Sequence, residues 1–138
     1  MISFAGMVKF AGVAAVLLIA SPNPSSAQTD NGFPFGLEMT LDVRPLSGSK
    51  RIPNLEIGDA GEVVLELWCK GGKGQFSVAG NTVIFVAGAM ELRTCPPDRA
   101  QADDDLIAAL SDAATWKRQG DAISFVGTRT LRFRLNTN

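Results

Sequence analysis

Two cysteines, Cys69 and Cys95, enclose the stretch that most constrains what this chain can fold into. Between them, runs of alternating apolar and polar residues are separated by glycine-rich segments, including a turn at Gly80-Asn81. Alternation with a period of two is typical of half-buried β-strands, and Gly and Asn favour the turns that join them. A helical pattern follows the second cysteine. The stretch therefore predicts antiparallel strands followed by one amphipathic helix, which is an α+β arrangement.

The same alternation predicts short strands before and after this stretch. The apolar side chains of the first run, residues 37–43, are expected to face inwards. The glycine-rich segment at 70–74 is expected to be a flexible hairpin loop, because glycine is a strong turn signal. The apolar run at 82–87 is expected to be covered on both faces. Strands are predicted at 37–43, 55–57, 62–69, 75–79, 82–87, 115–118, 122–126 and 130–135.

The predicted helix covers about Arg99 to Ala114. Asp98 is expected to be its N-cap, and Gln101 completes a capping-box pattern three residues later. Three aspartates at 103–105 are expected to form a solvated acidic first part of the helix, where the helix dipole favours negative charge. Successive helix residues point in different directions, so these aspartates do not predict a metal site. The apolar stripe consists of Ala102, Leu106, Ala109, Leu110 and Ala113, widened by Ile107 and Ala114.

The first 27 residues have the pattern of a cleaved secretory signal. Lys9 is followed by an apolar run from Phe10 to Ala20, and Ser25-Ser26-Ala27 supplies small residues for cleavage before Gln28. The alternative is an uncleaved amphipathic or core helix. We therefore expect a signal at 1–27, a flexible leader at 28–36 whose phenylalanines pack onto the domain, and a single domain at 37–138. The mature protein is expected in the periplasm or secreted, without a membrane span.

An exported protein with an even number of cysteines is expected to join them. The predicted disulfide between Cys69 and Cys95 closes a loop with a sequence separation of 26 residues. The alternative is a pair of buried thiols. Two cysteines in a chain without histidine make a poor metal site, and this spacing is not that of a CxxC redox motif.

The composition argues against several classes of function. The whole chain has 13 basic and 14 acidic side chains, so it lacks the net basic charge expected of a nucleic-acid-binding protein. It contains no histidine, which is the commonest general base and metal ligand. Ser77, Ser111 and Ser124 therefore have no histidine to activate them. The sequence predicts no catalytic residues, no metal site and no cofactor.

Basic residues near the C-terminus are candidates for an interaction patch. The patch is predicted on an edge of the sheet, where such charges also serve to block unwanted strand pairing. Lys50 and Arg51 are expected to be solvated in a loop, with a binding role as the alternative. Trp68 is expected to be a core or rim aromatic residue, with ligand stacking as the alternative. The residues of the predicted patch are Lys117, Arg118, Arg129, Arg132 and Arg134.

The order of these segments resembles the META/HslJ family of small exported bacterial domains. The resemblance covers about Phe33 to Leu135. It differs from the usual family pattern at Lys70 and Phe76, where Asn and Tyr are common. Its shared features are a strand ending in Cys69, a glycine segment before Phe76, the Gly80-Asn81 turn, Thr94-Cys95, the helix leucines Leu106 and Leu110, Trp116, Gly120-Asp121 and Leu131-Arg132-Phe133.

The resemblance implies a mainly antiparallel β-sheet curled as a cracked barrel with one helix packed against it. Members of the family are tied to envelope stress, drug tolerance and secretion, and no catalytic residues are established for them. We therefore expect a monomeric, non-catalytic envelope protein that acts through contacts with another envelope protein. The alternatives are a carrier of an apolar ligand or lipid in the barrel mouth, and a small module that resembles a protease inhibitor.

Overall fold

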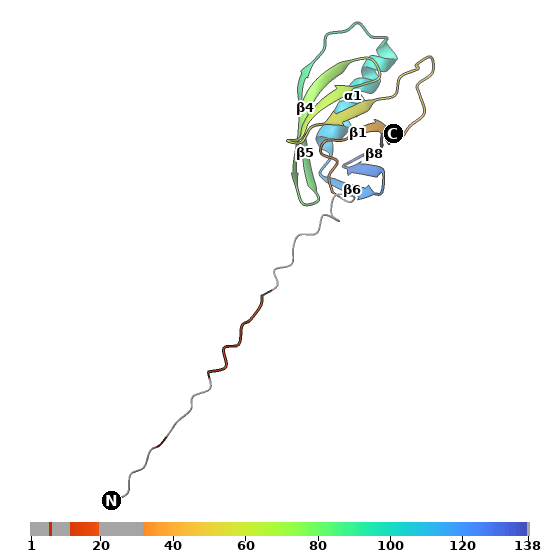
Figure 1. Cartoon of the computed structure of the whole chain (residues 1–138). Helices are drawn as coiled ribbons and strands as arrows, with labels where there is room; N and C mark the ends of the chain where they lie inside the picture. The colour runs from red at the N-terminus through yellow and green to blue at the C-terminus, as the bar shows by residue number, and fades with distance from the viewer. Residues whose placement is uncertain (1–5, 7–11, 20–31, 138) are drawn as a thin grey trace, which may run out of the picture.

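The computed structural model describes residues 6, 12–19 and 32–137 (Figure 1). The predicted signal lies largely outside this part of the chain, and so does the start of the predicted leader. Within the described part, eight strands and one helix follow one another. They are β1 (Glu38–Leu41), β2 (Asn54–Ile57), β3 (Glu62–Glu66), β4 (Gly71–Ala79), β5 (Thr82–Met90), α1 (Pro97–Asp112), β6 (Thr115–Gln119), β7 (Ala122–Val126) and β8 (Thr130–Leu135).

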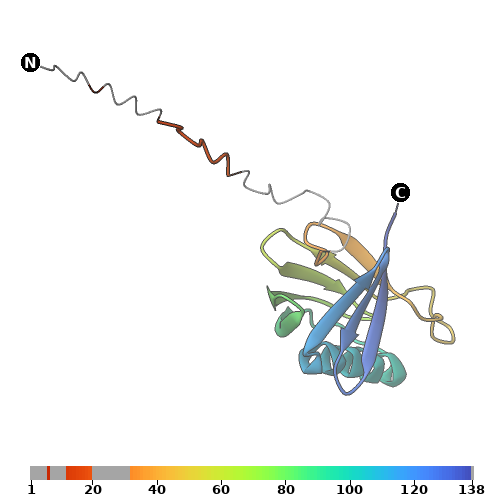
Figure 2. The ribbon, with the colours of Figure 1, turned by 90° about the horizontal axis from the view of Figure 1, so that it is seen from below.

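The strands form one antiparallel sheet that closes on itself. Each strand pairs with the next along the chain, and β8 returns to pair with β1. The ring is uneven, because β5 and β6 are paired only at Thr82 and Thr115. Figure 2 shows β4 and β5 on one side of the molecule and β6 to β8 on the other, with α1 at the bottom of the view. The expected α+β fold, a cracked antiparallel barrel with one helix, is confirmed.

The core consists of the inward-facing side chains of the strands and one face of α1. Phe76 and Phe125 stack with ring centroids 5.4 Å apart, and Phe133 meets Phe125 edge-on at 5.7 Å. From α1, Leu106 and Leu110 are buried in the same cluster, as the predicted apolar stripe requires. Burial of such side chains, each stabilising by about 1.5–3 kcal/mol, holds the sheet and the helix together.

We expected the glycine-rich segment at 70–74 to be a loop, but it forms the start of β4. Gly72 pairs with Leu65 of β3, and Gly74 pairs with Val63. A Cβ atom at Gly72 would lie 2.3 Å from the Met90 sulfur, and one at Gly74 would lie 2.6 Å from the Phe85 ring. The glycines are therefore needed for close packing against β5 rather than for a turn.

Two expectations about buried apolar side chains are wrong. Ile84 and Val86 are 57% and 60% exposed, so only the inner face of β5 is covered. In the first strand, Leu37 and Val43 are also exposed, because β1 is shorter than the alternating run and both residues lie outside it. Alternation identifies the two faces of a strand, but it does not show whether a second layer covers the outer face.

The helix begins two residues earlier than the capping pattern predicts. Pro96 is the N-cap residue and makes no side-chain hydrogen bond, and Pro97 is the first helical residue. Proline suits this position because its fixed φ is helical and its missing N–H would have no partner there. Asp98 therefore lies in the first turn, and the Gln101 side chain donates to Asp105 at 2.9 Å instead of capping the helix.

Candidate interaction site

The five basic residues predicted as a patch do not gather on one surface. Lys117 and Arg132 are exposed on the outer face, and the register joins them through Ser124 of β7. Arg118 lies on the opposite, inner row, where it donates to the Gly32 carbonyl at 3.1 Å. Arg134 forms an ion pair with Asp42, with Nε 3.2 Å from the carboxylate. Arg129 lies in the turn between β7 and β8.

The interpretation of these charges as protection of a sheet edge is wrong for β8. Both sides of β8 are paired, one with β7 and the other with β1. Closure of the ring therefore leaves no free edge at Arg132 and Arg134. The expectation that Lys50 and Arg51 are simply solvated is also wrong for Arg51, which forms an ion pair with Glu66 of β3.

Arg129 and Arg132 instead border an apolar groove between α1 and the β1–β8 side of the sheet, which we call the α1–β8 groove. Its cavity volume is about 400 Å³, within the range usual for binding pockets. Arg44, Asp42 and Asp105 are the other charged residues that line it. Its apolar floor is formed by Leu41, Leu46, Trp68, Leu106, Ala109 and Leu131.

The charges around the α1–β8 groove differ in whether they have partners. Asp42 is held by Arg134, and Asp105 accepts a hydrogen bond from Gln101. Within the described part of the chain, the side chains of Arg44, Arg129 and Arg132 form no ion pair and no hydrogen bond. All three are exposed. The groove therefore combines an apolar floor with unpaired positive charge at its rim.

A buried carboxylate positions Trp68 in the groove. Asp103 is 1% exposed and accepts hydrogen bonds from the backbone N–H groups of Trp68 at 2.7 Å, Cys69 at 3.2 Å and Lys70 at 2.8 Å. We expected Asp103 to be solvated, so this prediction is wrong. Its spacing to Leu106 and Leu110, three and seven residues on, already places it on the buried face of the helix.

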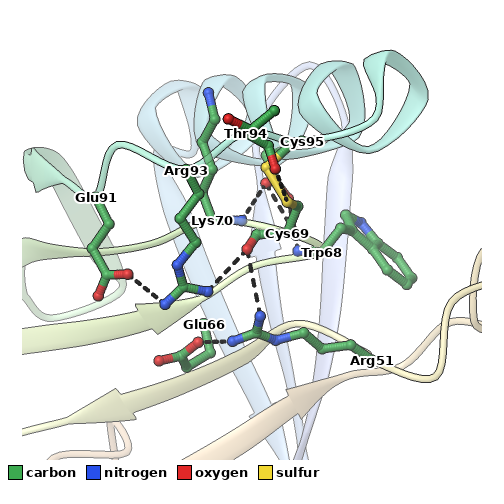
Figure 3. The surroundings of a disulfide bond; sticks show 10 residues. Arg51, Glu66, Trp68, Cys69, Lys70, Glu91, Arg93, Thr94 and Cys95 are labelled. Atoms are coloured by element: carbon green, nitrogen blue, oxygen red, sulfur yellow. Dashed lines mark hydrogen bonds and ion pairs between the residues drawn. A yellow bond between two sulfur atoms is a disulfide. The ribbon is translucent and has the colours of Figure 1, made fainter.

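The disulfide region fixes the same turn from the other side. The sulfur atoms of Cys69 and Cys95 lie 2.03 Å apart, at bonding distance. The Cys69 carbonyl accepts hydrogen bonds from Arg51 at 3.4 Å and Arg93 at 3.1 Å, and these arginines pair with Glu66 and Glu91 (Figure 3). The backbone of the turn that includes Trp68 is therefore held from both sides.

Neither a cluster of metal ligands nor a membrane-spanning helix is found among the described residues. No group of three or more Cys, Asp or Glu side chains is placed there to hold a metal ion. Across the same residues, no helix has the length and apolar character that a bilayer crossing requires. Among the hollows of the described surface, the α1–β8 groove combines an apolar floor with arginines that have no partner there.

Comparison with known proteins identifies the chain. The model of the META domain matches residues 38–137, which is most of the sequence. The chain belongs to the META domain family. The resemblance inferred from the sequence is thereby confirmed, and the family is in general non-catalytic.

Two solved structures share the fold of this chain. A protein from Burkholderia xenovorans, solved by NMR, is similar over 96% of this chain and 100% of its own, with a TM-score of 0.65 and 14% identity. A second NMR structure is similar over 72% of this chain and 89% of its own, with a TM-score of 0.55 and 13% identity. No curated protein matches the sequence significantly. At such low identity these similarities show the fold alone.

Proposed function

We propose that this META-family chain is an exported, non-catalytic protein that acts in the cell envelope by binding another envelope protein. The observation that carries the proposal is the α1–β8 groove, where unpaired arginines border an apolar floor. Arg and Trp are enriched at the energetic centres of protein interfaces. The absence of histidine from the whole sequence supports binding rather than catalysis.

The proposed location rests on the N-terminal pattern and on the cysteine pair. A disulfide persists in oxidising compartments such as the periplasm, and is rare in the cytosol. Intact mass measurement of the protein from fractionated cells tests this. We expect a chain that begins at Gln28 and is two hydrogens lighter than its reduced form. A full-length, reduced chain in the cytoplasmic fraction would contradict export.

Photocrosslinking in intact cells tests the proposed activity without assuming where the partner binds. A benzoylphenylalanine probe is placed separately at four exposed positions on different parts of the surface: Val43, Glu56, Ser77 and Lys117. We expect a discrete adduct with one protein from at least one position. If no position gives a protein adduct, although each variant is folded and exported, the proposed function is wrong.

The alternative of an apolar-ligand carrier predicts a different result. Aromatic side chains pack inside the ring, and Phe33 lies against Phe76, Trp116 and Phe125. A carried lipid would therefore have to use a surface groove. A native mass spectrum showing a lipid-sized adduct that is lost on denaturation would favour the carrier. A bare protein mass would favour the protein-binding function.

A further inference from the structure

We propose that the α1–β8 groove is the docking site for an acidic, amphipathic segment of the partner protein, one that carries a bulky apolar side chain next to Asp or Glu. This inference rests on the function proposed above, and adds to it a site and a partner chemistry. It depends on the charge of the rim, the nature of the floor and the rigidity of the walls.

The charge of the rim selects an anionic partner. The two acidic side chains of the groove, Asp42 and Asp105, are engaged by Arg134 and Gln101. The three arginines that line the groove, Arg44, Arg129 and Arg132, have no partner within the described residues. The whole chain has a net charge of −1, so this positive site contrasts with a slightly acidic molecule. Such an asymmetric charge distribution orients an acidic partner during encounter.

The floor selects an apolar side chain rather than a lipid chain. Trp68, Leu41 and Leu106 line the groove but are only 5–7% exposed, so each presents a narrow apolar surface. A single inserted side chain covers a surface of this size. A long acyl chain would leave much of its length in water, where it gains no hydrophobic stabilisation. A peptide also places carboxylates beside the inserted side chain. There, a planar guanidinium group can bind one carboxylate through two parallel hydrogen bonds.

The walls of the groove are fixed before a partner arrives. Asp103 of α1 accepts a hydrogen bond from the backbone of Trp68 and so attaches the turn that contains Trp68 to the helix. The disulfide between Cys69 and Cys95 links the same turn to the segment before the helix. The groove therefore does not need to order its own backbone on binding. Preorganisation of this kind reduces the entropy cost of association, which allows a short segment to bind measurably.

Selection from displayed short random peptides tests both the site and the partner chemistry. The bait is the purified oxidised protein that begins at Gln28. We expect enrichment of peptides that combine Asp or Glu with Trp, Phe or Leu. Their Kd, measured by fluorescence anisotropy, should rise about 10-fold or more in the double variant Arg129→Gln/Arg132→Gln. Arg129→Lys, which keeps the charge but loses the planar fork, should give an intermediate value.

The matched control is Lys73→Gln, which removes one exposed positive charge from the outer face of β4, away from the groove residues. It should change the Kd less than 2-fold. Circular dichroism melting checks that all variants are folded. The docking inference is overturned if no peptide is enriched, if uncharged or basic peptides are enriched instead, or if the enriched peptides bind the double variant as tightly as the natural protein.

The photocrosslinking positions separate failure of this inference from failure of the proposed function. Val43 lines the groove, and Glu56, Ser77 and Lys117 do not. A protein adduct from Val43 supports the groove. Adducts only from the other positions would leave the proposed function intact and overturn the docking site. Adducts from none would overturn both, and a lipid adduct at Val43 would replace the peptide with an anionic lipid.

Discussion

At the scale of single residues, Asp103 connects the helix to the sheet. Its carboxylate is buried and accepts hydrogen bonds from the backbone N–H groups of three consecutive residues, Trp68 to Lys70. Hydrogen bonds to an ionised acceptor are stronger than those between neutral groups. These bonds hold the turn without using any side chain of the turn itself.

Replacing Asp103 by Ala should destabilise the protein by about 2–4 kcal/mol, because buried N–H groups lose their acceptor. Asp103→Asn should cost less, since the amide oxygen still accepts. Asp104→Ala is the matched control: Asp104 is exposed on the same helix and should change the stability by about 0.5 kcal/mol or less. Urea unfolding followed by circular dichroism measures all three. Equal losses for Asp103→Ala and Asp104→Ala would contradict this role.

Asp112 makes the stability depend on pH. Hydrogen bonds from the backbone and side chain of Thr128 lower the pKa of the Asp112 carboxyl below its ordinary value of 3.8. A carboxyl with a lower pKa in the folded state stabilises the fold at higher pH, and this contribution is lost as the pH falls through the lowered pKa. Asp112→Asn should therefore be less stable than the natural protein at neutral pH, with the difference shrinking below pH 3.8. Unfolding midpoints across an acid pH series measure it, and a constant difference would contradict the assignment.

At the scale of elements, α1 is attached to the sheet by both packing and a covalent bond. Its apolar face enters the core through Leu106 and Leu110, and the segment before it is joined to the turn after β3 through Cys95 and Cys69. The bond therefore links the turn between β3 and β4 to the segment that leads from β5 into α1.

Removing the bond should lower the stability by about 3–4 kcal/mol, because a loop with a sequence separation of 26 residues is no longer closed in the unfolded chain. The double variant Cys69→Ser/Cys95→Ser, compared with the oxidised protein by urea unfolding, measures this. Adding a reductant should shift the natural protein to the value of the variant and leave the variant unchanged. An identical midpoint for the oxidised and reduced natural protein would show that the bond does not form.

At the scale of the whole molecule, an aromatic residue that precedes β1 completes the core. The Phe33 ring contacts Trp116 with centroids 5.3 Å apart and Phe76 at 5.5 Å. It thus joins β4 to β6 across the poorly paired side of the ring. Phe35 contacts Phe33 but is 41% exposed.

The pair Phe33→Ala and Phe35→Ala tests this contribution. Loss of Phe33 should cost about 2–3 kcal/mol, because several ring contacts and partly buried area disappear together. Loss of Phe35 should cost about 1 kcal/mol or less, since it touches one ring and faces solvent. Thermal unfolding of both variants measures the difference. A larger effect for Phe35 would show that the segment before β1 packs differently.

The sequence by itself determined most of the strands, the helix, and the burial of Leu106 and Leu110, although the glycine-rich start of β4 and the burial of Asp103 were predicted wrongly. These features depend on local periodicity, which the sequence displays directly. It also identified the family and the cysteine pair. The spacing of Asp103 to Leu106 indicates its buried position, whereas its charge favours a solvated one.

Only the tertiary structure decided how distant segments meet. Closure of β8 onto β1 gives Arg134 the partner Asp42, whereas Arg132, two residues away on the same face, has no ion-pair partner among the described residues. Arg118 lies on the inner row, where it donates to Gly32. The same closure and the packing of α1 create the α1–β8 groove, which joins residues from 41 to 132. No local sequence pattern predicts such a groove. It depends on which faces of the strands and the helix are buried, and on which charged side chains form ion pairs. Both are determined by packing between segments far apart in the chain.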